Sequence, residues 1–173
     1  TRYLDGNTKR VSGTGVISAY YEYGAEPDGS QWTRGYTGSA DNTSPMWEQT
    51  VTDPLGRAIR IEKPGYTGVE VSRNYYDDDG RLIRTVNPGM ADTVYEYDEL
   101  GRQIRSGLDI DHNGVLDLTS NDRITESDSA YTSIGSDWWR ETVQRVYATE
   151  NDGTPTTTGI QRNRITGLDS GLN

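Results

Sequence analysis

The chain has 173 residues and a formal net charge of −10, which argues against nucleic acid or an anionic membrane as a partner, since both need basic patches. It contains no cysteine, which excludes disulfide bonds and thiolate metal sites. Only 31% of its residues are hydrophobic, and its aromatic residues are 12 tyrosines and 4 tryptophans, without phenylalanine. This composition favours a thin β-sheet with one solvated face over a thick globular core.

Two further expectations concern the membrane and the ends of the chain. No window approaches 18 consecutive apolar residues, so we expect no membrane insertion. The sequence opens on Thr1 without a methionine, and it shows no charged and apolar leader. We therefore expect a piece of a longer chain, with no signal peptide in this piece.

The first part of the chain, residues 1–44, is predicted to be a degenerate N-terminal hairpin region. Its segment Tyr21–Trp32 reads YEYGAEPDGSQW, in which a strand-like run precedes the turn sequence Glu-Pro-Asp-Gly. Trp32 takes the position after the turn glycine that isoleucine takes in the better copies downstream.

Residues 45–106 contain a sequence unit that occurs three times. In each copy an aspartate lies three residues before a glycine and an arginine follows the glycine directly. An isoleucine and a second arginine lie three and four residues after the glycine. The copies, whose glycines are 24 and 21 residues apart, are Asp53–Arg60, Asp77–Arg84 and Asp98–Arg105. A period of this size is typical of repeat proteins in which each unit packs on its neighbour.

Turn chemistry explains most of this unit. Aspartate favours the first position of a type I turn, where its carboxylate accepts hydrogen bonds from the backbone amides ahead of it. Glycine takes the left-handed position that closes the hairpin. Pro-Gly pairs in Lys63–Gly65 and Asn87–Gly89 predict the return turns at the opposite ends of the strands. The predicted fold is all-β, with serial antiparallel β-hairpins forming an extended, curved repeat sheet.

The residues of the unit have separate predicted roles. The turn-forming aspartates and the left-handed glycines are Asp53, Asp77, Asp98, Gly56, Gly80 and Gly101. The isoleucines predicted to pack between successive hairpins are Ile59, Ile83 and Ile104. Tyr97 and Arg102 are predicted, together with Ile104, to bind one hairpin to the next.

The pattern Tyr-Asp-x-x-Gly-Arg, followed two residues later by isoleucine, resembles the YD repeat of RHS-type proteins. The best copies are Tyr76–Arg81 and Tyr97–Arg102, whereas the copy at Asp53 has Thr52 in place of the tyrosine. The resemblance spans residues 45–106 and implies long β-hairpin sheets that wind into a hollow shell. In bacterial toxins of this type the shell encloses a C-terminal effector, and other members are large cell-surface or adhesion proteins. A piece of this length has too few hairpins to close such a shell.

After Arg105 the repeat is interrupted, and residues 107–124 are predicted to be an Asp-rich insertion. The segment Asp109–Asp117 reads DIDHNGVLD and fits the opening of a calcium loop, in which alternating oxygen side chains converge on one point. An EF-hand would have a bidentate glutamate where this chain has Ser120, so Asp122 is taken as the last ligand. The predicted Ca²⁺ ligands are Asp109, Asp111, Asn113, the carbonyl of Val115, Asp117 and Asp122.

A plain hairpin turn is the alternative interpretation of this segment, because Asp111 also lies three residues before Gly114. The density of carboxylates favours calcium. Four aspartates within fourteen residues repel one another unless a cation or solvent screens them.

Residues 125–173 are predicted to be a divergent C-terminal hairpin region. Trp138–Tyr147 alternates as a strand does, and Glu150–Gly153 supplies a turn sequence. Thr156–Ile165 is the predicted returning strand. The adjacent residues Trp138 and Trp139 are expected on opposite faces of the sheet.

The sequence contains no recognisable catalytic constellation. The single histidine, His112, lies inside the aspartate loop, where its side chain is expected to point into solvent. There is no nucleophile elbow and no phosphate-cradling glycine loop. Carboxylate pairs abound, but every prominent aspartate already has a turn or a metal explanation. We therefore predict no enzymatic activity, no catalytic residue and no residue that binds an organic cofactor.

The predicted function is structural: a β-sheet wall segment of a large secreted or cell-surface RHS/YD-repeat protein of bacterial type, stabilised by Ca²⁺, with a role in a shell, toxin delivery or surface assembly. Its partners would be the remaining repeats of the parent chain or neighbouring copies. The alternative is a carbohydrate- or protein-binding adhesin module that uses exposed tryptophan and tyrosine rings. A row of exposed rings would favour the adhesin, and rings buried between hairpins would favour the wall.

Overall fold

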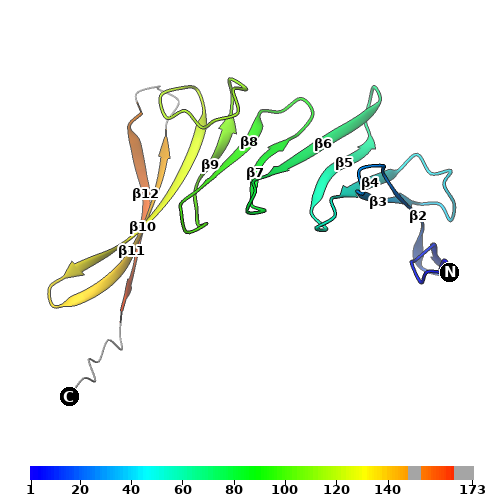
Figure 1. Cartoon of the computed structure of the whole chain (residues 1–173), viewed down its shortest axis with the longest axis horizontal. Helices are drawn as coiled ribbons and strands as arrows, with labels where there is room; N and C mark the ends of the chain where they lie inside the picture. Colours follow the sequence, from blue (N-terminus) through cyan, green and yellow to red (C-terminus); the bar gives the residue numbers. More distant parts are fainter. Residues whose placement is uncertain (148–152, 166–173) are drawn as a thin grey trace, which may run out of the picture. The chain divides into compact units, whose positions relative to one another are not determined.

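A computed structural model describes residues 1–147 and 153–165 of the chain. The regular structure of these residues consists of twelve β-strands in one sheet, and the order of the strands in the sheet equals their order along the chain (Figure 1). This arrangement confirms the predicted all-β fold of serial antiparallel hairpins. Among the described residues, no helical segment has the length and apolar character needed to cross a bilayer.

The strands alternate in direction, and each pairs with the strand that follows it. Their bounds are β1 Arg10–Gly13, β2 Val16–Ala25, β3 Gln31–Thr37, β4 Trp47–Thr52, β5 Ala58–Pro64, β6 Val69–Tyr76, β7 Leu82–Val86, β8 Asp92–Tyr97, β9 Gln103–Asp109, β10 Arg123–Ile134, β11 Asp137–Tyr147 and β12 Pro155–Arg164.

The contacts of the chain divide it into two compact units. The first consists of Thr1–Tyr75 and Thr85–Met90, and the second of Tyr76–Arg84 and Ala91–Asn173. The first unit holds β1 to β5 and nearly all of β6, and the second holds β8 to β12. The four-part division proposed from the sequence is based on motif boundaries and stays a prediction.

The repeated turns have the predicted geometry. The glycines Gly56, Gly80 and Gly101 have φ angles of 81°, 82° and 77°. In each turn the glycine N–H donates a hydrogen bond of 2.9 Å to the carbonyl of the aspartate three residues earlier. The degenerate copy between β2 and β3 closes in the same way, since Gly29 has a φ of 88° and bonds back to the carbonyl of Glu26 at 3.0 Å.

The return turns also lie where the Pro-Gly pairs predict them. Between β5 and β6, the N–H of Gly65 donates to the carbonyl of Gly68 at 2.6 Å. Between β7 and β8, the N–H of Met90 donates to the carbonyl of Asn87 at 3.2 Å. The connections between consecutive strands from β4 to β9 are therefore set by local sequence signals.

Few apolar side chains are fully enclosed, as expected for a thin sheet. In the second unit Val94, Leu116 and Ile124 form a small buried cluster, with Leu118 and Tyr147 packed against it. In the first unit the buried hydrophobic side chains include Tyr36 and Val51. The isoleucines of the repeat, Ile59, Ile83 and Ile104, are half-buried, and their packing between hairpins stays a prediction.

Sequence analysis missed the strand that follows the Asp-rich segment. β10 pairs with β9 on one side and along its whole length with β11 on the other, from Ile124 opposite Tyr147 to Ile134 opposite Asp137. The predicted strands at Trp138–Tyr147 and Thr156–Ile165 correspond to β11 and β12. Most of the turn predicted at 150–153 lies outside the described residues.

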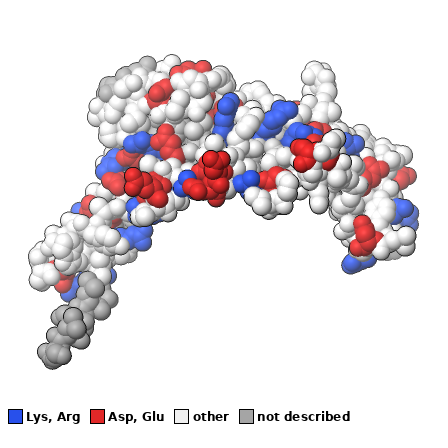
Figure 2. Space-filling model, viewed as in Figure 1, with Lys and Arg blue, Asp and Glu red and all other residues white. Residues whose placement is uncertain are grey.

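Acidic and basic side chains lie next to one another along the strands on the face drawn in Figure 2, which shows no continuous basic region. The described ion pairs explain this pattern, because arginines of one strand bind carboxylates of the same turn or of a nearby strand.

Candidate metal centre

The Asp-rich segment forms a long loop that is tied down onto the sheet. β9 ends at Asp109 and β10 begins at Arg123, so residues 110–122 make the connection. Leu116, in the middle of this loop, is 6% exposed and belongs to the buried cluster with Val94 and Ile124. The loop therefore has a fixed apolar anchor, which holds the polar residues on both sides of it in place.

Two buried aspartates close the loop at its ends. The side chains of Asp109 and Asp122 are 0% and 1% exposed. The carboxylate of Asp109 accepts hydrogen bonds from the backbone N–H groups of Asn113 (3.1 Å) and Gly114 (2.7 Å). That of Asp122 accepts from Ile110 at 2.8 Å and from Asp117 at 2.9 Å. Each carboxylate binds loop backbone through both of its oxygens, and each oxygen keeps a further lone pair.

Three carboxylates converge in this loop. Asp109, Asp111 and Asp122 each offer an oxygen, and these oxygens lie within 4.8 Å of one another. Asp111 is exposed, yet the pKa of its carboxyl is raised above its usual value by desolvation and by the neighbouring Asp109 and Asp122 carboxyls. Three negative groups at this separation repel one another, and a cation between them would relieve that repulsion.

The remaining predicted ligands lie beside this triad. The side-chain amide of Asn113 donates to Asp111 at 3.2 Å and to Asp117 at 2.6 Å. The side-chain amide oxygen (Oδ1) of Asn113 accepts a hydrogen bond from the backbone N–H of Val115 at 2.9 Å. The Val115 side chain is half exposed. The structure thus brings together three of the six predicted residues, including the substitute ligand Asp122. Asn113 is hydrogen-bonded to Asp111 and Asp117, and the carbonyl of Val115 as a ligand stays a prediction.

The backbone at Asp111–Gly114 does not form the tight turn of the alternative interpretation, and metal binding by the loop stays a prediction. The N–H of Gly114 bonds to the side chain of Asp109 rather than closing a turn onto Asp111, and the next strand begins only at Arg123. His112 is exposed as predicted, and its φ of 60° places it in the left-handed region. A non-glycine residue in that region is uncommon, and here it lets the chain reverse between Asp111 and Asn113.

The donor set suits a hard cation. All the convergent atoms are carboxylate oxygens, and the first-row transition metals that prefer nitrogen or sulfur find neither kind of side chain in the triad.

Sequence analysis missed a buried ion network beside the loop. Glu126 of β10 is 8% exposed. Its carboxylate accepts hydrogen bonds from Arg105 of β9 (2.8 Å), Arg145 of β11 (2.7 Å) and the Tyr147 hydroxyl (3.1 Å). These groups lower the pKa of Glu126 against the opposing effect of desolvation. The sequence offered one signal for this inward-facing carboxylate. Glu126 lies two residues after Ile124, and residues at this spacing in a strand lie on the same face.

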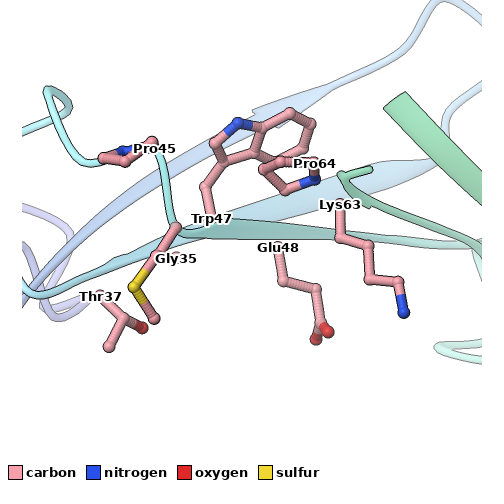
Figure 3. A pocket seen from close by; sticks show the side chains of 8 residues that line it. Gly35, Thr37, Pro45, Trp47, Glu48, Lys63 and Pro64 are labelled. Atoms are coloured by element: carbon pink, nitrogen blue, oxygen red, sulfur yellow. The ribbon is translucent and has the colours of Figure 1, made fainter. Parts of the chain in front are cut away.

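The surface around Trp47 contains a shallow hollow of about 380 Å³. It is lined by Trp47 and Pro64, which Figure 3 shows on one side of the strand, with Glu48 and Lys63 on the other. The guanidinium of Arg34 lies 4.5 Å from the centroid of the Trp47 ring. Because a cation of the chain itself already contacts this ring, the hollow offers little free aromatic surface to a ligand.

The fold and the repeated turns define a class of protein: a β-hairpin repeat protein whose units are closed by an Asp-x-x-Gly-Arg turn. Residues 76–107 match the family model described as RHS Repeat. This match covers the two best copies of the Tyr-Asp-x-x-Gly-Arg pattern and confirms the resemblance in that segment. A comparison with curated proteins found no match.

Proposed function

We propose that this chain is a wall segment of a larger RHS-type protein that is secreted or displayed on the bacterial cell surface. The observation that carries this proposal is the repetition of one turn structure at 53–57, 77–81 and 98–102, each with the same aspartate bonds and the same glycine conformation. A repeated unit of this kind builds surface area rather than a single site.

Contacts between successive hairpins support the role of a wall. The hydroxyl of Tyr97 in β8 donates to the carbonyl of Leu82 in β7 at 2.8 Å. The guanidinium of Arg81 also lies 5.3 Å from the centroid of the Tyr97 ring. The tyrosine of one repeat thus binds the turn end of the preceding repeat, as predicted. Arg102 differs from the prediction, because it binds Asp98 of its own turn at 2.7 Å.

The outer edge of β12 provides a test of the wall. In this chain the backbone groups of β12 that point away from β11 lack a strand partner among the described residues, since β12 is the last strand of the sheet. We expect alternate amides of β12 to exchange rapidly with deuterium in the isolated chain. In the longer protein a further hairpin would pair with this edge and protect the same amides. Equal exchange rates in the two proteins would contradict the wall.

The tryptophans do not favour the adhesin alternative. Trp32, Trp47 and Trp139 are half-buried in the sheet, whereas Trp138 is 52% exposed. Tyr131 lies on the same face as Trp138, because it pairs with Arg140 two residues further along the strand. Two exposed rings in the last part of the sheet do not form a row, so we favour the wall.

We further propose that the loop at 110–122 binds Ca²⁺ through Asp109, Asp111 and Asp122, and that the ion fixes the loop against the sheet. The convergence of the three carboxylates supports this proposal. An ion that binds only the folded chain stabilises it by mass action, so added Ca²⁺ should raise the melting temperature and a chelator should reverse the effect.

Matched variants make this calcium test specific. Asp111→Asn removes one charge of the triad without altering the buried hydrogen bonds of Asp109 and Asp122, and it should abolish the response to Ca²⁺. Asp79→Asn is the control, because the Asp79 side chain is 73% exposed in a hairpin turn and lies outside the triad. A melting temperature that ignores both Ca²⁺ and chelator would disprove the site.

A further inference from the structure

A second hollow lies at the N-terminal end of the first unit. It has a volume of about 300 Å³ and is lined by Tyr3, Asp5, Tyr20, Glu22, Tyr23 and Trp32. Four of these six residues are aromatic and the other two are acidic. The volume is at the lower end of the range for small-molecule sites.

The hollow is built by the first residues of the chain, which run beside β2. An isolated bridge joins Arg2 to Thr8, and the Tyr23 hydroxyl donates to the carbonyl of Thr8 at 2.9 Å. The Tyr3 hydroxyl lies 3.2 Å from that of Tyr20 and 3.0 Å from the carbonyl of Tyr21. These bonds fix the tyrosine rings before any ligand arrives, which lowers the entropic cost of binding one.

Trp32 is fixed by a glycine on the neighbouring strand. Gly24 pairs with Trp32 across β2 and β3, and a β-carbon added to Gly24 would lie only 2.4 Å from the indole ring. One side of the indole therefore lies against the backbone of β2. The glycine makes this close packing possible, and Trp32 keeps enough free surface to line the hollow.

The two carboxylates of the hollow lack cationic partners. Glu22 accepts hydrogen bonds from the Tyr36 hydroxyl at 3.0 Å and from the side-chain amide of Asn42 at 3.2 Å. Asp5 accepts from the backbone and side chain of Asn7, at 2.9 and 3.0 Å. In the described part of the chain neither carboxylate forms a salt bridge, whereas the nearby Glu26 and Glu62 both bind Arg60. Among the described residues, both carboxylates of the hollow are therefore held by neutral hydrogen-bond donors and by no directly paired cation.

One of the rings, Tyr3, already has a cation of the chain beside it, whereas for the rings of Tyr20 and Trp32 no cation–π contact is described. The ammonium group of Lys9 lies 5.0 Å from the centroid of the Tyr3 ring, although Lys9 is not among the residues that line the hollow. Aromatic faces attract cations through their quadrupole, and the attraction strengthens when the cation is partly desolvated. Two carboxylates add a Coulombic attraction that a neutral ligand would not feel.

We propose that this hollow is a binding site for a small organic cation, with a trimethylammonium group as its best-fitting chemistry. The rings of Tyr3, Tyr20 and Trp32 would enclose the methyl groups, and Glu22 and Asp5 would balance the charge. This site is separate from the calcium loop and does not depend on the wall function.

A neutral analogue separates charge from shape. Choline should bind the full chain, as measured by NMR titration and by changes in tryptophan fluorescence. The dimethylbutanol in which a carbon replaces the choline nitrogen should bind at least about fivefold more weakly, because it loses the cation–π and carboxylate attraction. Equal binding of the two compounds would overturn the proposal, as would binding of a methyl glycoside in place of choline.

Two variants and a control test whether choline binds in this hollow. Glu22→Gln keeps the size of the side chain and removes its charge, and Trp32→Ala removes one wall of the hollow; each should weaken choline binding at least about fivefold. Glu48→Gln removes an exposed carboxylate of β4 that does not line this hollow, so it should leave binding unchanged. The circular dichroism spectrum of each variant checks its folding. Undiminished binding by a folded Glu22→Gln variant would contradict the site.

A vesicle experiment, combined with the choline titration, distinguishes two sources of the trimethylammonium group. Sedimentation with phosphatidylcholine vesicles, compared with phosphatidylglycerol vesicles, shows whether a lipid headgroup reaches the hollow. Choline binding together with binding to phosphatidylcholine vesicles assigns the group to a lipid surface, and choline binding alone assigns it to a soluble molecule. Absence of choline binding at millimolar concentration rejects both sources.

Discussion

The aspartate of each repeated turn binds more partners than turn propensity alone requires. One oxygen of Asp98 accepts the backbone N–H groups of Leu100 (3.0 Å) and Arg102 (2.8 Å), and the other accepts the Arg102 guanidinium at 2.7 Å. The backbone bond from Arg102 and its side chain lower the pKa of Asp98, although desolvation opposes them. This arrangement recurs at Asp53 and Asp77. It explains why arginine always follows the glycine of the unit.

The lowered pKa of these aspartates determines how the stability of the turns changes with pH. Because the folded chain holds each carboxylate in its charged form, its contribution is present above the pKa of the unfolded chain. It is lost as the pH falls through the folded pKa. The turns are therefore expected to weaken together in acid, below about pH 4.

The left-handed glycine of the turn provides the first mutational test. Gly101→Ala forces a β-carbon into a φ of 77° and should lower the free energy of unfolding by about 1–2 kcal/mol, measured by urea denaturation. The matched control is Gly159→Ala in β12, where the space for a β-carbon is open and φ lies outside the left-handed range. A Gly101→Ala variant as stable as its control would contradict the turn assignment.

At the scale of strands, ion pairs take over part of the role that a hydrophobic core has in thicker proteins. Glu126 of β10 forms ion pairs with Arg105 of β9 and Arg145 of β11. Arg105 also forms an ion pair with Glu96 of β8 at 3.1 Å. Four consecutive strands are thus crossed by one chain of charge-assisted hydrogen bonds. Because Glu126 is nearly buried, these bonds are less screened by solvent than surface pairs.

Glu126→Gln tests the contribution of this network. At pH 7 the variant should be less stable by about 1–3 kcal/mol, because hydrogen bonds to a charged group are replaced by weaker ones. The pKa of Glu126 is lowered in the folded chain, so its stabilising effect is lost as the pH falls below the ordinary value of 4.5. The variant should therefore show a shallower loss of stability in acid, measured by denaturation at several pH values.

The surface pair of Lys63 and Glu70 supplies the control for that experiment. Its atoms are 3.6 Å apart and both side chains are about half exposed, so Glu70→Gln should change stability by less than about 1 kcal/mol. If the two variants behaved alike at pH 7, the network would contribute no more than an ordinary surface ion pair.

The sequence predicted those strands and turns that depend on local chemistry. Asp98 and Gly101 predict a hairpin turn within four residues, and the Pro-Gly pair in Asn87–Gly89 predicts the return turn between β7 and β8. β10 was missed, because its residues are mostly polar and its position depends on pairing with β9 across the long loop. Within the loop, the ligand spacing indicated Asp109 and Asp111. Asp122 was also predicted, as a substitute for the glutamate that an EF-hand has. The backbone bonds from Ile110 and Asp117 that hold it in the triad are encoded by no spacing rule.

For the molecule as a whole, the terminal strands of the sheet and the net charge act in opposite directions on self-association. The sheet has two terminal strands, β1 and β12, and every residue of β12 is exposed. An unpaired edge of this kind is a template for pairing with another chain. At neutral pH the net charge of −10 opposes such pairing between copies by mutual repulsion. Ile160, an apolar residue 54% exposed on β12, adds an attractive contact at that edge.

Self-association should therefore rise as the charge is titrated away. We expect light scattering to detect dimers or larger species as the pH falls from 7 toward the sequence pI of about 4.5, where the mutual repulsion vanishes. Ile160→Lys places a charge on the edge strand and should suppress this association. Tyr66→Lys makes a similar exchange at a fully exposed position in the return turn after β5, away from either edge strand, and should leave association nearly unchanged. If both variants suppressed association equally, net charge alone would control it, and pairing at β12 would be excluded as its cause.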